Sequence, residues 1–309
     1  MYTEEQKKKF KGIGALVLTI FDQDLKLNTN ALQKNIRFMI DNHINASNGF
    51  LVCNGSTGEC YAMNLEERKQ VIQATVEAAN KEIPVVACCN DTDAFSVIEL
   101  ANHAKKVGAD AALIIQSYYL PFNEEQIYNF FQFVNDRVDI PIMIYNNPSV
   151  CSGVEMSMDL LKKLAKLNKV FALKQTTNSS KHFIQSQVLA PELLIFTGSS
   201  STEPFGDMAG MHGFFSFLSC FYPQMQIELW EAIRTKDYVA AGKIHTKELL
   251  LYDWWWSGGL GQTFGQIVHA KKALDLMGHY GGYSRPPLVP LKEAQTEKLK
   301  QILQAWGLI

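Results

Sequence analysis

The sequence lacks a long apolar run and a basic stripe, and each absence argues against a class of function. No apolar segment approaches the roughly 20 residues that a membrane-spanning helix needs. The stretch MYTEEQKKKFKG at residues 1–12 has no apolar core of a signal peptide, so we expect a cytoplasmic protein. Lysines and arginines are scattered and the formal net charge is -2. This distribution argues against nucleic acid and membrane partners.

Potential metal ligands are also dispersed. The cysteines form no C-x-x-C pair, and none of the seven histidines has the spacing of a zinc motif. Several cysteines lie in apolar segments, which is typical of reduced, buried thiols. The six cysteines are Cys53, Cys60, Cys88, Cys89, Cys151 and Cys220. We therefore expect reduced thiols and no metal site.

What the sequence does contain is a regular alternation of apolar runs and helical patterns. The runs are apolar almost throughout, as in parallel strands covered on both faces. The segments between them have apolar residues at helical spacing, with Asn or Asp where a helix begins. The expected strands are 14–19, 49–55, 84–89, 111–117, 141–147, 170–176, 193–199 and 213–219, and clear helical patterns are 28–43, 64–81, 93–108 and 123–137.

Eight strand–helix units predict an α/β fold, a (β/α)₈ TIM barrel. A doubly wound open sheet is the alternative, but no G-x-G-x-x-G follows the first strand. After residue 222 only helical patterns occur, at 224–256, 263–278 and 291–306. We therefore expect a barrel over residues 1–222 and a helical region over 223–309 that packs on it.

One expected strand, VFALKQTT at residues 170–177, carries a lysine at its centre. Burying an ammonium group costs several kcal/mol unless it is paired or loses its proton. Lys174 either reaches water at a strand end or serves as a neutral amine nucleophile. Strand alternation puts Ala172, Lys174 and Thr176 on one face, which we expect to be the barrel interior, and Phe171 and Leu173 on the other.

Polar residues follow several of the other strands, where barrel enzymes place their chemistry. If Tyr145 on the neighbouring strand also faces inward, it meets Lys174. A neutral amine attacks a carbonyl, and the protonated imine that results is an electron sink. Tyr145 could move protons. The turn GSTGE offers backbone N–H groups and the hydroxyls of Ser56 and Thr57 to a carboxylate. These residues describe a site for a 2-oxo acid.

The chain resembles the dihydrodipicolinate synthase/N-acetylneuraminate lyase family of lysine-dependent 2-oxo-acid lyases. The likeness extends over nearly the whole chain and rests on GALVLTIF, GSTGE, LEER, YYLPF, YNNP and ALKQT, in that order. The resemblance implies a homotetramer or homodimer, no metal or other cofactor, and two small-molecule partners, pyruvate and an aldehyde.

The resemblance also implies a role for each matching residue. Lys174 would form the Schiff base and Tyr145 would be the proton shuttle. Ser56 and Thr57 would hold the substrate carboxylate. Three further residues would complete the site: Tyr119 across a subunit contact, and Thr176 and Gly198 beside the second half of the substrate. Tyr119 could instead be a packing or interface residue, because tyrosine is common at interfaces.

The sequence departs from the family's patterns at the positions expected to meet the second half of the substrate. Val150 stands where dihydrodipicolinate synthases carry an arginine for the aldehyde's carboxylate. SGV at 152–154 and ALKQT resemble the sialic acid lyase branch, but Ser200 and Ser201 replace its Asp–Glu pair. Phe217 replaces a serine, and Glu203 could partly substitute for the missing acids. We expect a less polar aldehyde or a shorter sugar acid.

Three functions fit these residues. The first is an aldolase or lyase that acts on a 2-oxo acid through the lysine imine, and is neither dihydrodipicolinate synthase nor true sialic acid lyase. The second is a dehydratase of a 2-oxo-3-deoxy sugar acid, which uses the same imine. The third is a non-catalytic 2-oxo-acid binder, against which an intact nucleophile argues.

Overall fold

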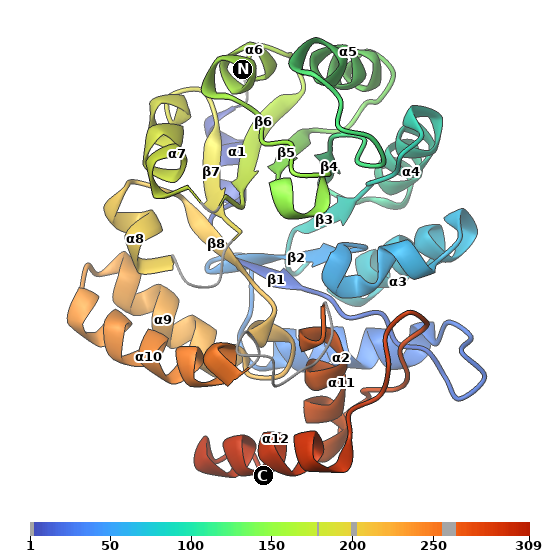
Figure 1. Ribbon diagram of the computed structural model, residues 1–309, viewed down its shortest axis with the longest axis vertical. Helices are drawn as coiled ribbons and strands as arrows, with labels where there is room; N and C mark the ends of the chain where they lie inside the picture. Colours follow the sequence, from blue (N-terminus) through green and yellow to red (C-terminus); the bar gives the residue numbers. More distant parts are fainter. Residues whose placement is uncertain (1–2, 178, 199–202, 255–263) are drawn as a thin grey trace.

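The computed structural model describes residues 3–177, 179–198, 203–254 and 264–309. Its centre is a closed barrel of parallel strands in the order β1 to β8, ringed by helices (Figure 1). The strands are β1 (Gly12–Leu16), β2 (Gly49–Cys53), β3 (Val85–Cys88), β4 (Ala111–Ile115), β5 (Ile142–Asn146), β6 (Val170–Gln175), β7 (Leu194–Thr197) and β8 (Gly213–Ser216). The predicted (β/α)₈ barrel is confirmed.

Each of the eight strands ends one to three residues earlier than the sequence pattern indicated. The apolar pattern continues past the last ladder hydrogen bond, but the backbone there already turns away to form loops. Of the expected strand 193–199, residue 199 lies outside the described part. The residues just beyond the ladder include Thr176 and Gly198, so the early ends free these positions to line a site.

The helices begin where side-chain caps were expected. The Asn28 side chain accepts a hydrogen bond from the Ala31 backbone N–H, and Asn64 and Glu67 form a capping box. Up to β8 the helices are α1 (Glu4–Lys9), α2 (Thr29–Asp41), α3 (Leu65–Ala79), α4 (Ala94–Val107), α5 (Glu124–Asn135), α6 (Met158–Leu164), α7 (Ser180–Gln185) and α8 (Glu203–Met208).

An aromatic cluster fills the barrel interior on the side of the amino ends of the strands. Phe10, just before β1, lies 5.7 Å from Phe50 and 5.0 Å from Phe171 between ring centroids. Phe50 in turn contacts Phe196 and Phe215 edge to face. These rings fill the barrel interior between its amino end and the carboxyl ends of the strands.

The facing predicted for β6 is right for three residues and wrong for Phe171. Ala172 and Lys174 face the interior, and Leu173 packs in the outer core between strands and helices. Phe171 also faces inward, because the β5–β6 register shifts between Ile142 and Met143. A residue is thereby gained on β6, as in a β-bulge, and strict alternation fails there.

Within the described residues, four α-helices follow β8: α9 (Pro223–Arg234), α10 (Tyr238–Trp254), α11 (Gln266–Leu276) and α12 (Glu293–Ala305). The expected helix 224–256 is thus broken after Arg234, where Lys236 takes a positive φ; residues 255, 256 and 263 lie outside the described part. Trp230 of α9 packs against Phe214 of β8, while α11 and α12 extend away from the ring (Figure 1). The division at residue 222 stays a prediction.

Within the described residues, every helix is too short or too polar to span a bilayer.

Candidate active site

A cavity of about 260 Å³ lies at the carboxyl ends of the strands. Its polar lining comes from loops and strand ends on many sides of the barrel, and no described acidic residue lines it. The lining includes Ser56, Thr57, Cys88, Asn90, Tyr145, Asn147, Val150, Lys174, Thr176, Gly198, Phe215, Phe217 and Gln266. A cavity with one cationic group and no acid suits an anionic ligand.

Lys174 reaches this cavity between two aromatic rings. Its Nζ lies 4.1 Å from the ring centroid of Tyr145 and 4.2 Å from that of Phe215. Tyr145 and Lys174 are direct partners across the β5–β6 ladder, as expected. Lys174 is only 7% exposed, which rules out the alternative of a rim lysine in bulk water. The described residues that line the cavity with it include no acidic side chain.

Gly198 and Thr176 surround the stem of this lysine. A Cβ placed on Gly198 would lie 1.9 Å from Thr176 Oγ1 and 2.7 Å from Lys174 Cε. Only glycine therefore fits beneath the lysine side chain. Thr176 Oγ1 is buried and has no hydrogen-bond partner in the described structure, so a bound ligand could supply one.

Ser56 and Thr57 line the opposite side of the cavity in a single 3₁₀ turn, Ser56–Gly58. Within the described residues their backbone N–H groups donate to no acceptor. The Gly58 carbonyl accepts a hydrogen bond of 2.6 Å from Thr19 Oγ1, which fixes the turn against β1. Two hydroxyls and two free N–H groups form a suitable receptor for a carboxylate.

Glu59, the last residue of the GSTGE motif, anchors this turn on the side away from the cavity, through residues near the end of the chain. Its carboxylate is fully buried and accepts hydrogen bonds from Lys271 Nζ, Ser284 Oγ and the Arg285 backbone N–H. Burial lowers the pKa of Lys271, and the adjacent Glu59 opposes that shift. No local sequence pattern reveals this ion pair, because Glu59 and Lys271 are 212 positions apart.

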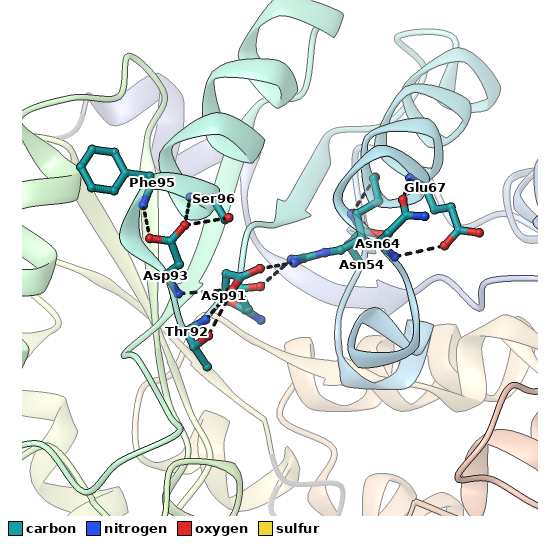
Figure 2. Close-up of polar contacts among 10 residues, drawn as sticks. Asn54, Asn64, Glu67, Asp91, Thr92, Asp93, Phe95 and Ser96 are labelled. Atoms are coloured by element: carbon teal, nitrogen blue, oxygen red, sulfur yellow. Dashed lines mark hydrogen bonds and ion pairs between the residues drawn. The ribbon is translucent and has the colours of Figure 1, made fainter.

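Arg68, in the LEER segment, joins the loops that follow β2 and β3. Its backbone carbonyl accepts a hydrogen bond of 2.8 Å from Asn54, and its guanidinium bonds Asp91 at 3.1 Å and the Asn90 carbonyl at 2.6 Å. Figure 2 shows the loop that follows β3. In this loop Asp91 accepts a hydrogen bond from the Thr92 backbone N–H, and the Asp93 side chain caps the start of α4. Asn90, which lines the cavity, is thereby fixed in place.

Val150 and Phe217 both line the cavity, so two of the positions expected to meet the second half of the substrate are apolar. Glu203 does not substitute for the missing acids. It is 4% exposed, and its Oε2 lies 3.7 Å from His245 Nδ1 instead of facing the cavity. Ser200 and Ser201 lie outside the described residues.

The described residues contain one group of side chains that could hold a metal ion. Glu203, His245 and Glu248 place one potential ligand atom each within 4.8 Å of the others. None of the three lines the cavity. The cavity itself presents no such group, and the expectation of a metal-free site stays a prediction.

The structure does not bring Tyr119 into the cavity of its own chain. The side chain is 80% exposed and is not among the lining residues. Its neighbour Tyr118 packs against the inner cluster instead, and burial raises the pKa of Tyr118 to about 12. An exposed Tyr119 is compatible with the expected subunit contact, which a single chain does not test.

The cysteines are free, as predicted, and five of the six are buried. Burial raises the pKa of Cys151 to about 12 and that of Cys88, in the cavity wall, well above its ordinary value. Both therefore remain protonated thiols near neutral pH, and neither is a thiolate nucleophile.

The closed barrel and the position of its cavity define this protein as a (β/α)₈ enzyme with its site at the carboxyl ends of the strands. The chain belongs to the dihydrodipicolinate synthetase family, whose model matches residues 9–306. It is accordingly a class I pyruvate-dependent lyase or aldolase. The family expected from the sequence is confirmed, whereas the predicted branch within it stays a prediction.

The relatives and the solved structure described next match nearly the whole chain. The 4-hydroxy-tetrahydrodipicolinate synthase of Clostridium perfringens (strain SM101 / Type A) is 32% identical over 304 residues, 97% of this chain and 99% of that protein. Its namesake from Archaeoglobus fulgidus is 28% identical over 302 residues, 97% of this chain and 99% of that protein. YagE, a prophage protein of this family from E. coli K12, was solved in complex with pyruvate; it is 27% identical with a TM-score of 0.88, covering 97% of this chain and 99% of its own.

Replacing Lys271 with methionine should leave the Glu59 carboxylate buried without a counter-ion. We expect Lys271→Met to lower the free energy of unfolding by about 3–5 kcal/mol in urea titrations. Lys272→Met, the adjacent and less buried lysine, is the matched control and should cost less than about 0.5 kcal/mol. The double variant Lys271→Met/Glu59→Gln should recover part of the loss. Equal effects of the two single variants would contradict the assigned ion pair.

Proposed function

We propose that this protein cleaves and forms a 2-oxo acid by a reversible aldol reaction through an imine on Lys174. The observation that carries the proposal is the position of Lys174 Nζ, enclosed by Tyr145 and Phe215 in a cavity without a described acid. An enclosed neutral amine is the nucleophile that attack on a ketone requires. The pyruvate complex of YagE supports pyruvate as one partner.

Each step uses a group that lines the cavity. Lys174 Nζ attacks the C2 carbonyl, and the Tyr145 phenol gives its proton to the departing oxygen, so that water, a protonated imine and a Tyr145 phenolate result. In the cleavage direction Tyr145 takes the proton of the C4 hydroxyl, the C3–C4 bond breaks, and its electron pair enters the enamine as the imine nitrogen becomes neutral. The aldehyde departs, C3 regains a proton, and water releases pyruvate. Ser56 and Thr57 would hold the carboxylate throughout, and Thr176 and Gly198 would border the departing half.

The aldehyde we propose is less polar than that of the named relatives. The name that the relatives carry supports the synthesis of 4-hydroxy-tetrahydrodipicolinate. Val150 and Phe217 in the cavity wall support an apolar aldehyde, because they offer a carboxylate no hydrogen-bond donor. The same imine also permits the dehydration of a sugar acid, and analysis of the products separates the two reactions.

Tyr119 enters the proposal through the assembly. We infer a homodimer or homotetramer in which the exposed Tyr119 of one copy approaches the cavity of its neighbour. A large exposed aromatic side chain next to a half-buried one is typical of an interface residue.

Borohydride trapping tests the imine directly. Incubation with pyruvate and borohydride should add one reduced pyruvate to the intact mass, and peptide mapping should place it on Lys174. Lys174→Ala should abolish the adduct. Lys169→Ala, which removes a lysine just before β6 at the amino end of the barrel, should retain it. An adduct that survives in Lys174→Ala would refute the assigned nucleophile.

Gly198→Ala should disable the site without unfolding the protein. The new Cβ would displace the side chains of Lys174 and Thr176, so the yield of trapped pyruvate should fall by at least about 10-fold, as expected for a misplaced reacting group. Gly242→Ala in α10, where a Cβ meets nothing within 4 Å, is the control and should trap normally. If Gly198→Ala trapped as much pyruvate as the wild-type protein, Gly198 would not be needed to position Lys174.

Aldehyde preference can be measured with two compounds of equal length, butanal and 4-oxobutanoate. With pyruvate, the wild-type protein should condense butanal faster. Val150→Arg should shift the ratio of kcat/KM toward 4-oxobutanoate by about 10-fold or more, because a charge-assisted hydrogen bond contributes about 1.5–3 kcal/mol. Val150→Leu serves as the control for bulk. A wild-type preference for 4-oxobutanoate would overturn the proposed apolar aldehyde and favour the activity in the relatives' name.

A further inference from the structure

Asn147, the second asparagine of YNNP, is held in one orientation beside Tyr145. Its Oδ1 accepts a hydrogen bond of 3.1 Å from the Ser149 backbone N–H, a group that can only donate. The other end of the amide, Nδ2, must then face the Tyr145 hydroxyl, 2.7 Å away. Asn147 is buried and lines the cavity. The amide orientation thus follows from the hydrogen-bond network itself.

This orientation fixes the direction of the hydrogen bond at the tyrosine. Asn147 Nδ2 has no lone pair to offer, so the phenol oxygen is the acceptor. Among the described residues, no acceptor bonds the phenolic hydrogen. That hydrogen is free to point into the cavity, which Tyr145 lines. A donor that points at the oxygen stabilises the phenolate more than the phenol, since a charged acceptor makes the stronger bond.

We propose that Asn147 is a positioning residue that prepares Tyr145 to act as a base toward the imine on Lys174. This inference rests on the proposed function and names a residue that sets its proton transfer. Asn147 acts through Tyr145 and not on the substrate: it supplies the hydrogen bond that keeps the phenol oxygen ready to take up a proton.

The step is observable with pyruvate alone. In the protonated imine, the Tyr145 phenolate that remains after the departing water has taken the phenol proton accepts a proton from the C3 methyl group. The C–H electron pair becomes the C2–C3 double bond, and the C=N pair moves to the nitrogen, which gives a neutral enamine. In deuterated water the phenol exchanges its proton with solvent and returns deuterium to C3. Loss of the methyl signal of pyruvate in a proton NMR spectrum therefore measures Tyr145 as a base.

Asn147→Asp is the sharpest variant, because it is nearly isosteric and keeps an oxygen for the Ser149 N–H. It replaces the N–H donor beside Tyr145 with a carboxylate oxygen. The Tyr145 hydroxyl would then donate a hydrogen bond to residue 147 instead of accepting one from it. We expect methyl exchange to fall by about 10-fold or more near neutral pH, and its pH profile to move to alkaline pH by about one unit or more. Asn147→Leu removes the donor without adding charge and should shift the profile in the same direction.

Asn146→Asp is the matched control. Asn146 makes similar bonds, donating to Gln175 at 2.8 Å and accepting from the Met156 N–H at 3.1 Å, but its side chain has no hydrogen bond to the Tyr145 hydroxyl. This variant should lose stability and keep the wild-type pH profile of exchange.

Borohydride trapping is measured first in each protein. A wild-type protein that traps no pyruvate would refute the proposed function and this inference with it. If the wild-type protein traps pyruvate, but Asn147→Asp exchanges the methyl protons at the wild-type rate and with the wild-type pH profile, only the role of Asn147 is refuted. Equal shifts in Asn146→Asp and Asn147→Asp would also overturn it, because they would reflect added charge and not the lost donor.

Discussion

The confinement of Lys174 is the constraint on which the rest of the site depends. Two aromatic rings enclose the Lys174 amine, and the described residues of the cavity wall include no acid. Several features serve this arrangement. The aromatic cluster fills the barrel interior on the side of the amino ends, Gly198 leaves room for the lysine stem, and the β5–β6 register brings Tyr145 alongside. Loss of any one would leave the lysine enclosed but misplaced.

The two sides of the cavity are held by different means. Lys174 and Tyr145 stand on neighbouring strands, so ladder hydrogen bonds fix their separation. Ser56 and Thr57 lie beyond the end of β2, where no ladder supports the backbone. Their turn is fixed instead by the Glu59 carboxylate, which reaches into the last part of the chain. A rigid reactive group therefore faces a receptor whose position depends on distant residues.

The sequence predicts the parts of this molecule that have local causes. Strand and helix patterns, Asn caps and the position of Lys174 beside Tyr145 follow from period and spacing. The facing of Phe171 does not, because a register shift on the neighbouring strand decides it. Glu59 could be singled out in its motif but not paired with Lys271, since nothing local connects them. Tyr119 shows a further limit: its predicted role depends on a second chain, and its own chain leaves it exposed.

The Glu59 anchor has a consequence for the order in which the protein matures on the ribosome. All strands of the barrel have been synthesised by Ser216, and Lys174 and Tyr145 with them. The partners of Glu59, at positions 271, 284 and 285, emerge only near the end of translation. Until then a buried carboxylate has no counter-ion, which favours an unfixed turn. The last part of the chain must therefore be synthesised before Glu59 gains the partners that anchor the turn beside the cavity.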